Sequence, residues 1–223
     1  YDIVRCATPV EDRPNVLVLG DRMGADTYVM LSRAWPEVNF LQATAGACTA
    51  LLNFDHVKGR YAACRALNAY RFSELLEQQI DLVVLASTWT RKRIRPLKET
   101  VDYLHSIGKR VLVIGPRATL GASLPLLISQ QASLNEANKA LREQVRKKDF
   151  LLETMRAAIP GVDILDIGRI QCTPDCDVIE GEQLLYYDAM HFTVLGAQRM
   201  GERLRESFDL LGFIDSPARG DTR

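Results

Sequence analysis

The stretch Val16-Leu17-Val18-Leu19-Gly20-Asp21-Arg22-Met23-Gly24-Ala25-Asp26 decides the fold of this chain. Four apolar residues followed by Gly and Asp are typical of a buried strand that runs into a tight turn. A helical pattern begins near Met23, so the stretch predicts a strand, a turn and a helix. Because α/β folds place their chemistry where such strands end, Asp21 and Arg22 are candidate site residues.

The rest of the chain repeats this alternation of strands and helices. Helices between consecutive strands predict a mostly parallel five-stranded sheet in a three-layer α/β/α domain. We expect this domain to span residues 15–215, with a linker from a preceding segment at 1–14 and a flexible tail at 216–223. The predicted strands are 15–19, 38–43, 81–86, 110–114 and 162–167, and the main helices are 23–35, 60–79, 94–107, 134–158 and 194–211.

Composition and charge exclude several classes of protein. The chain has 223 residues, of which 47% are hydrophobic, and this suits one well-filled globular domain. Lys and Arg together number 28, as do Asp and Glu, so the net charge is zero and no nucleic-acid partner is expected. No apolar run is long enough to span a bilayer. Because the first residue is Tyr1 rather than Met, we expect a piece of a longer protein.

Five cysteines bear on the compartment of the protein. Cys172 and Cys176 are spaced to close a small loop, Cys48 is able to reach Cys64, and Cys6 is left over. Pairing would place the chain in an oxidising compartment, whereas free thiols would place it in the cytosol. A zinc site is the weaker alternative, because the Cys-x₃-Cys spacing lacks a second ligand pair. We therefore favour disulfides and predict no metal and no cofactor.

Asp188 and His191 form the sharpest candidate pair, at the predicted start of the last helix. A carboxylate that accepts a hydrogen bond from one ring nitrogen of His fixes its tautomer and leaves the other nitrogen to take a proton from a nucleophile. An alternative interpretation is structural: Asp188 caps the last helix and His191 is a half-buried residue without chemistry.

Three segments together carry a family resemblance. They are the strand end Leu19-Gly20-Asp21, the loop with Gly46, and the run Tyr-Tyr-Asp-Ala-Met-His-Phe-Thr-Val-Leu-Gly-Ala at residues 186–197. Over residues 15–211 the chain resembles the SGNH (GDSL-like) hydrolase superfamily, and more narrowly the SGNH domain fused to type 3 membrane acyltransferases of bacterial envelopes. The corresponding family segments read approximately Gly-Asp-Ser-His and Asp-x-x-His-Leu-Ser-x-x-Gly-Ala. The resemblance implies a flavodoxin-like fold and a serine-type esterase or O-acyltransferase.

The resemblance also implies roles for individual residues. His191 would be the general base and Asp188 its orienting acid, while Gly46 and the backbone N–H of residue 22 would form the oxyanion hole beside Asp21. Trp89 would wall the acyl pocket, although a purely structural role in the core fits the sequence equally well. Family members often carry an oxyanion-hole Asn after the third strand, and this chain has Ser-Thr-Trp at 87–89 instead.

Arg22 is the main departure from the family pattern, because it stands where the nucleophilic Ser is expected. A guanidinium stays protonated and offers only hydrogen-bond donors, so it cannot attack an acyl carbon. The sequence therefore predicts weak or no serine-type esterase activity for this chain. Arg22 would instead pair with Asp188 or occupy the oxyanion site.

Three hypotheses for function follow. The first is a periplasmic or otherwise extracytoplasmic domain that transfers an O-acetyl group to a cell-surface carbohydrate. Its partners would be an acyl donor, a glycan acceptor and a membrane acyltransferase domain, which would tether it to the inner membrane through a segment outside this chain. The second is a non-catalytic carbohydrate-binding or interaction module that keeps the fold. The third is a cytosolic flavodoxin-like ligand-binding protein, for which all five cysteines would be free thiols. The basic run at 91–95 would face an anionic glycan or lipid headgroup, or form a solvated helix start.

Overall fold

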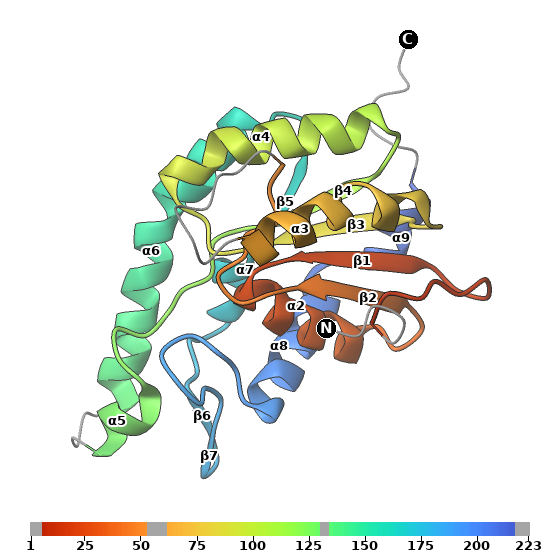
Figure 1. Cartoon of the computed structure of the whole chain (residues 1–223). Coiled ribbons are helices and arrows are strands. Elements are labelled where there is room, and N and C mark those ends of the chain that lie inside the picture. The colour runs from red at the N-terminus through yellow and green to blue at the C-terminus, as the bar shows by residue number, and fades with distance from the viewer. Residues whose placement is uncertain (1–5, 53–61, 130–133, 217–223) are drawn as a thin grey trace.

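One parallel sheet forms the centre of the molecule (Figure 1). The computed structural model describes residues 6–52, 62–129 and 134–216. The five strands pair in the order β2-β1-β3-β4-β5, and every pairing is parallel. The strands are β1 (Asn15–Gly20), β2 (Asn39–Thr44), β3 (Leu82–Ala86), β4 (Val111–Ile114) and β5 (Asp163–Leu165). The predicted α/β class with a five-stranded sheet is confirmed.

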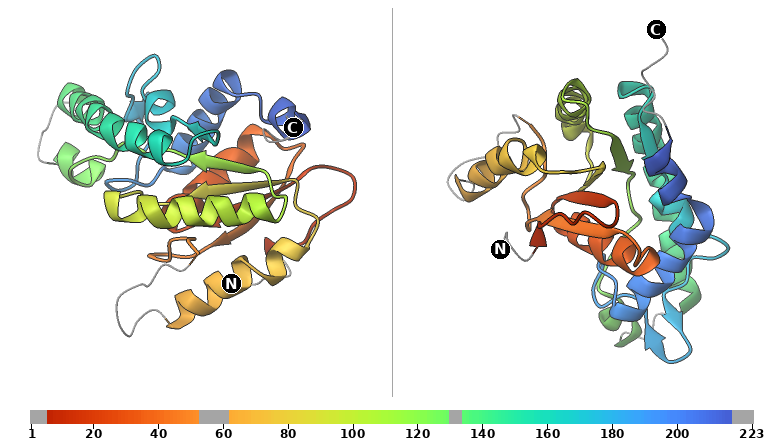
Figure 2. Two further views of the ribbon diagram at one scale, coloured as in Figure 1. Left: turned by 90° about the horizontal axis from the view of Figure 1, so that it is seen from above. Right: turned by 90° about the vertical axis from the view of Figure 1, so that its right-hand side faces the viewer.

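Helices cover both faces of this sheet, as the two views of Figure 2 show. Because side chains alternate along a strand, Val16 and Val18 pack under α2 and α8, whereas Leu17 and Leu19 pack under α4 and the segment after α3. α6 runs along the β5 edge and contributes to both cores. The helices are α2 (Arg22–Ala34), α3 (Ala62–Arg71), the 3₁₀ helix η1 (Glu74–Glu77), α4 (Arg91–Ser106), α5 (Leu124–Ser129), α6 (Leu134–Ala158), α7 (Ile167–Gln171), α8 (Val194–Ser207) and α9 (Leu210–Asp215), and a small hairpin joins β6 (Ile179–Glu180) to β7 (Gln183–Leu184).

Several predicted boundaries were wrong because polar residues interrupt the apolar pattern. The predicted helix 194–211 ends at Ser207, and Asp209 starts a new helix by accepting from the Gly212 N–H at 3.0 Å. The predicted strand 162–167 is shorter, since Asp166 caps α7 instead. In the same way the predicted helix 60–79 divides into α3 and η1, and its first two residues lie outside the described ranges.

The end of β1 lies where the direction of the sheet's connections changes. From β1 the chain crosses to β2 on one side, and β3 lies on the other, so a crevice is expected beside the carboxyl ends of β1 and β3. The two strands approach closely here, because a Cβ at Gly20 would lie 1.8 Å from the carbonyl oxygen of Ala86. The Gly of the opening stretch thus brings Asp21 and Arg22 up against the end of β3.

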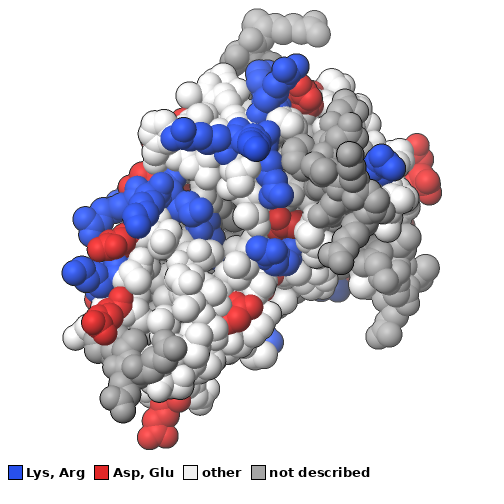
Figure 3. All heavy atoms as spheres, turned by 60° about the vertical axis from the view of Figure 1, so that its left-hand side comes forward, with Lys and Arg blue, Asp and Glu red and all other residues white. Residues whose placement is uncertain are grey.

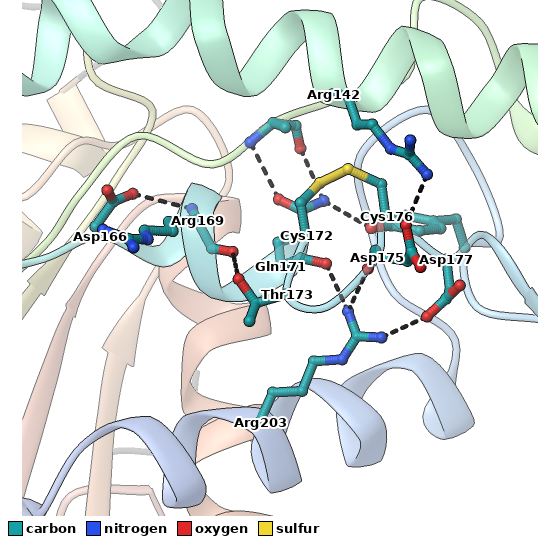
Figure 4. Close-up of a disulfide and its surroundings, with 12 residues drawn as sticks. Arg142, Asp166, Arg169, Gln171, Cys172, Thr173, Asp175, Cys176, Asp177 and Arg203 are labelled. Carbon is teal, nitrogen blue, oxygen red and sulfur yellow. Dashed lines mark hydrogen bonds and ion pairs between the residues drawn. A yellow bond between two sulfur atoms is a disulfide. The ribbon is translucent and has the colours of Figure 1, made fainter.

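Two disulfides confirm the favoured cysteine prediction: Cys48–Cys64 and Cys172–Cys176. They rule out both the Cys172–Cys176 zinc site and a protein with five free thiols. Figure 4 shows Arg203 of α8 reaching into the small loop closed by the second disulfide. There it donates to the main-chain carbonyls of Gln171, at the end of α7, and Asp175, within the loop. It also pairs with Asp177 at 2.5 Å, so α8 and this loop are held together. Among the described helices, none is both long and apolar enough to cross a membrane.

Candidate functional site

Asp188 and His191 are joined by a short hydrogen bond. The distance from His191 Nδ1 to Asp188 Oδ2 is 2.6 Å, and the second carboxylate oxygen accepts from the N–H groups of Met190 and His191, each at 2.7 Å. The predicted position at a helix start was wrong, because the pair lies in a tight turn before α8, whose N-cap is Thr193. The interpretation of Asp188 as the cap of that helix was therefore also wrong. Asp188 instead caps its own turn and fixes the imidazole within it.

The surroundings of Asp188 favour its ionised form. Partial burial raises the pKa of this carboxyl, but the hydrogen bond from the His191 ring and those from the two backbone N–H groups together lower the pKa below its usual value. The ring of Tyr187 stacks on the imidazole of His191, with a centroid distance of 5.5 Å and an interplanar angle of 13°. The imidazole is thus held from its edge by Asp188 and over its face by Tyr187. The role of Tyr187 was not predicted from the sequence.

Asp21 connects the ends of β1 and β3. Its Oδ1 accepts from the Met23 N–H at 2.9 Å, which caps α2, and its Oδ2 accepts from the Thr88 N–H at 3.0 Å. Arg93 lies 3.7 Å from the same carboxylate and also donates to the Thr88 carbonyl. Since Asp21 is 3% exposed and both of its oxygens are engaged, its role in this structure is to shape the turn that presents residue 22.

Arg22 is the exposed first residue of α2. Its Nε donates to the Met190 sulfur at 3.1 Å, across 168 positions of the chain. No ion pair joins it to Asp188 in the described ranges, so the pairing considered from the sequence is not formed. Because Met190 directly precedes His191, this contact brings the position expected for the nucleophile next to the Asp188–His191 turn.

Gly46 lies exposed in the turn after β2, at the same edge of the sheet. The N–H of Ala45 donates to the Gly20 carbonyl at 3.2 Å, and buried Arg71 donates to the carbonyls of both Gly20 and Cys48. These bonds fasten the turn beside the end of β1. None of the described residues accepts a hydrogen bond from the Gly46 N–H, so this donor is available at the edge where residue 22 lies.

Comparison with known proteins identifies the family. The SGNH domain found fused to AT3 domains matches residues 2–206. The chain belongs to this family. No curated protein matches the chain in sequence. Among solved structures, this SGNH domain is similar to the periplasmic domain of the lipopolysaccharide acetyltransferase of Salmonella ser. Paratyphi A, with a TM-score of 0.70 and 19% identity over 91% of this chain and 85% of that chain.

A second solved structure has the same fold. It is an inferred SGNH hydrolase from Slackia heliotrinireducens, with a TM-score of 0.53 and 14% identity over 87% of this chain and 98% of that chain. At these identities the two structures establish the fold alone, whereas the family match establishes membership. The resemblance to SGNH domains fused to membrane acyltransferases is therefore confirmed.

Arg117, which follows β4, holds in place the turn that carries Asp188 and His191, called the dyad below. The guanidinium pairs with Asp26 of α2 at 2.7 Å and donates to the Met190 carbonyl. It also lies over the ring of Phe192, 4.5 Å from the centroid. The sequence does not single out this residue, because an Arg after a strand is a weak signal and its partners are 73 and 91 positions away.

A pocket with a volume of about 140 Å³ opens beside Arg22, between the ends of β3 and β4 and the helices α2 and α6. Trp89 lines it and is also part of the core, being 4% exposed with its Nε1 donating to the Ile114 carbonyl at 2.6 Å. The lining includes Met190 but neither Asp188 nor His191, so pocket and dyad meet at the Arg22–Met190 contact.

In the described ranges, no group of three or more His, Cys, Asp and Glu is placed to hold a metal.

Proposed function

We propose that this chain is the extracytoplasmic SGNH-type domain of an envelope acyltransferase that transfers an O-acetyl group to a cell-surface carbohydrate. The observation that carries the proposal is the His191–Asp188 pair, 2.6 Å apart and in contact, through Met190, with the position expected for the nucleophile. Membership of the family of SGNH domains fused to AT3 domains supports a membrane acyltransferase partner. Two disulfides favour an oxidising compartment such as the periplasm.

In the mechanism that this geometry supports, His191 is the general base. Nδ1 donates to ionised Asp188, which leaves Nε2 to take the proton from the attacking hydroxyl that a Ser at residue 22 would supply. The backbone N–H groups of Gly46 and residue 22 would stabilise the oxyanion that forms on the acyl carbon. Collapse of the oxyanion would break the bond to the donor's leaving group, which takes the proton from His191, and leave the acyl group on a Ser at residue 22. A sugar hydroxyl, deprotonated by His191 in turn, would then take the acyl group, and the proton would return to the freed Ser oxygen.

Arg22 interrupts this mechanism at its first step. A guanidinium provides no hydroxyl, so the acyl-enzyme does not form at residue 22, and we propose that serine-type turnover by this chain is impaired. An alternative proposal is a carbohydrate-binding module that retains the SGNH fold without catalysis. The observation that favours it is the position of Arg22 itself, which contacts Met190 and lines the adjacent pocket.

Hydrolysis of p-nitrophenyl acetate by the chain and its Arg22→Ser variant tests the proposal. We expect the unmodified chain to stay near the uncatalysed rate and Arg22→Ser to gain at least about 100-fold, since a nucleophile supplies most of the rate of such a triad. Arg22→Ala is the matched control, because it removes the guanidinium without adding a hydroxyl. Adding His191→Ala to Arg22→Ser should abolish the gain. A folded but inert Arg22→Ser variant would favour the binding module.

A further inference from the structure

The pocket beside Arg22 is lined by positive charge. Among the described residues that line it, Arg22, Arg117 and Lys148 are basic and none is acidic. We propose that this pocket binds a small anionic group, a carboxylate or a phosphate, carried by the acceptor saccharide. That the ligand is the acceptor saccharide rests on the proposed function. That the ligand is negatively charged rests on the pocket alone.

Two of the three cations lack a carboxylate partner in the part of the chain that the structure describes. Neither Arg22 nor Lys148 forms an ion pair within the described ranges, whereas Arg117 is paired with Asp26. Asp21, the acid nearest in sequence to Arg22, is buried and engaged by N–H groups and by Arg93. The pocket therefore carries an excess of positive charge, and its partly enclosed walls strengthen the attraction of an anion relative to open water.

Buried donors in the pocket wall also lack partners. The Arg117 side chain is 4% exposed, and its Nε is buried without a hydrogen-bond acceptor among the described residues. The hydroxyl of Thr88, which also lines the pocket, is likewise buried without a partner. Buried donors without acceptors are uncommon in folded proteins, and because both atoms are closed to solvent, a ligand oxygen would satisfy them only after a shift of the pocket wall.

The size and apolar lining of the pocket limit the ligand. A volume of about 140 Å³ is close to the roughly 150 Å³ of a cavity that holds one six-carbon ring. Met23, Ile114 and Ile167 supply apolar wall that suits the carbon face of a ring. The pocket thus accommodates the charged end of a single sugar residue, such as the carboxylate of a uronic acid or the phosphate of a sugar phosphate. It is too small for a longer segment of glycan.

The surface around the pocket extends the same charge. Figure 3 shows Lys and Arg side chains gathered on the face where α6 and the beginning of α4 lie. Arg91 of α4 lies over the ring of Phe150 of α6, 4.7 Å from its centroid, and Lys147 lies on the same stretch of α6. The chain as a whole has no net charge, so this concentration is local and would draw an anionic saccharide toward the pocket.

Titration of the unmodified chain by NMR with glucuronic acid, glucose, glucose 1-phosphate and acetate tests the proposal. We expect binding of glucuronic acid or glucose 1-phosphate that weakens with added salt, and no comparable binding of glucose. Lys148→Gln and Arg22→Gln should each weaken it about tenfold, the value of one charged hydrogen bond. Lys147→Gln is the matched control, because Lys147 is exposed, adjacent in sequence and absent from the pocket wall.

Three outcomes would overturn the proposal. The first is equal binding of glucose and glucuronic acid, and the second is an equal loss of affinity in Lys148→Gln and Lys147→Gln. The third is binding of acetate as tight as that of both charged sugars, which would show a site for free anions. The titration needs no catalytic activity. An inert Arg22→Ser variant would therefore count against acyl transfer while leaving this result intact, and failure of sugar binding would leave the esterase test intact.

Discussion

The guanidinium of Arg117 and the carboxylate of Asp26 lie 2.7 Å apart in an ion pair whose side chains are 4% and 16% exposed. The same guanidinium donates to the carbonyl of Met190, so the pair joins α2 to the turn that carries Asp188 and His191. Helix α2 begins at residue 22 and the turn contains the candidate base. The pair therefore fixes the two halves of the candidate site relative to each other.

Removal of one partner of this pair should destabilise the fold strongly. We expect Asp26→Asn to lower the free energy of unfolding by about 3 kcal/mol, because it leaves the buried charge of Arg117 without a counterion. Asp102→Asn is the control, since Asp102 forms an exposed pair with Lys98 in which both side chains are at least half exposed, and should cost less than about 1 kcal/mol. Urea unfolding measures both, and equal changes would contradict the role of the Arg117 pair.

Asp188 should make stability depend on pH in the acid range. Its pKa is lowered in the folded protein, so its contribution is complete above the unfolded pKa of about 3.9 and is lost as the pH falls through the folded pKa. The stability difference between the chain and Asp188→Asn should therefore shrink as unfolding is measured from pH 7 toward pH 2. A constant difference over this range would contradict the prediction. Carbon-13 NMR titration of the Asp188 carboxyl provides an independent check.

Gly196 should not tolerate a side chain. A Cβ there would lie 2.0 Å from the carbonyl oxygen of Leu185, which is where the start of α8 packs against the segment leading to the dyad. We expect Gly196→Ala to cost about 1–3 kcal/mol, although alanine is the better helix former. Gly121→Ala is the control, because no heavy atom of the described residues lies within 4 Å of its added Cβ. Thermal unfolding that ranks the two variants equally would contradict the prediction.

The disulfides predict the number of free thiols and which of the two bridges contributes more to the free energy of unfolding. Denatured protein without reductant should show one free thiol, that of Cys6, and five after reduction. Replacement of Cys48 and Cys64 together by Ala should cost about 3 kcal/mol, and replacement of Cys172 and Cys176 about 2 kcal/mol, because the longer loop gains more chain entropy when opened. Denaturant unfolding measures the order, and a reversed order would contradict the entropic account.

The sequence by itself determined the features that depend on near neighbours. The apolar run of β1 and its Gly-Asp end predicted a buried strand that turns into a helix, and the structure has both. The three-residue spacing of Asp188 and His191 was enough to place their side chains within hydrogen-bond reach. It was not enough to distinguish a turn from a helix start, since a carboxylate can cap the N–H groups of either.

Only the tertiary structure decided which distant residues meet. The Arg22–Met190 and Arg117–Asp26 contacts join residues 168 and 91 positions apart, and no periodicity relates such pairs. The positive charge of the pocket likewise arises because α2, the loop after β4 and α6 converge, in a chain whose composition is neutral. Local patterns fix which face of an element is buried, whereas the packing of several elements around one sheet fixes which side chains share a site.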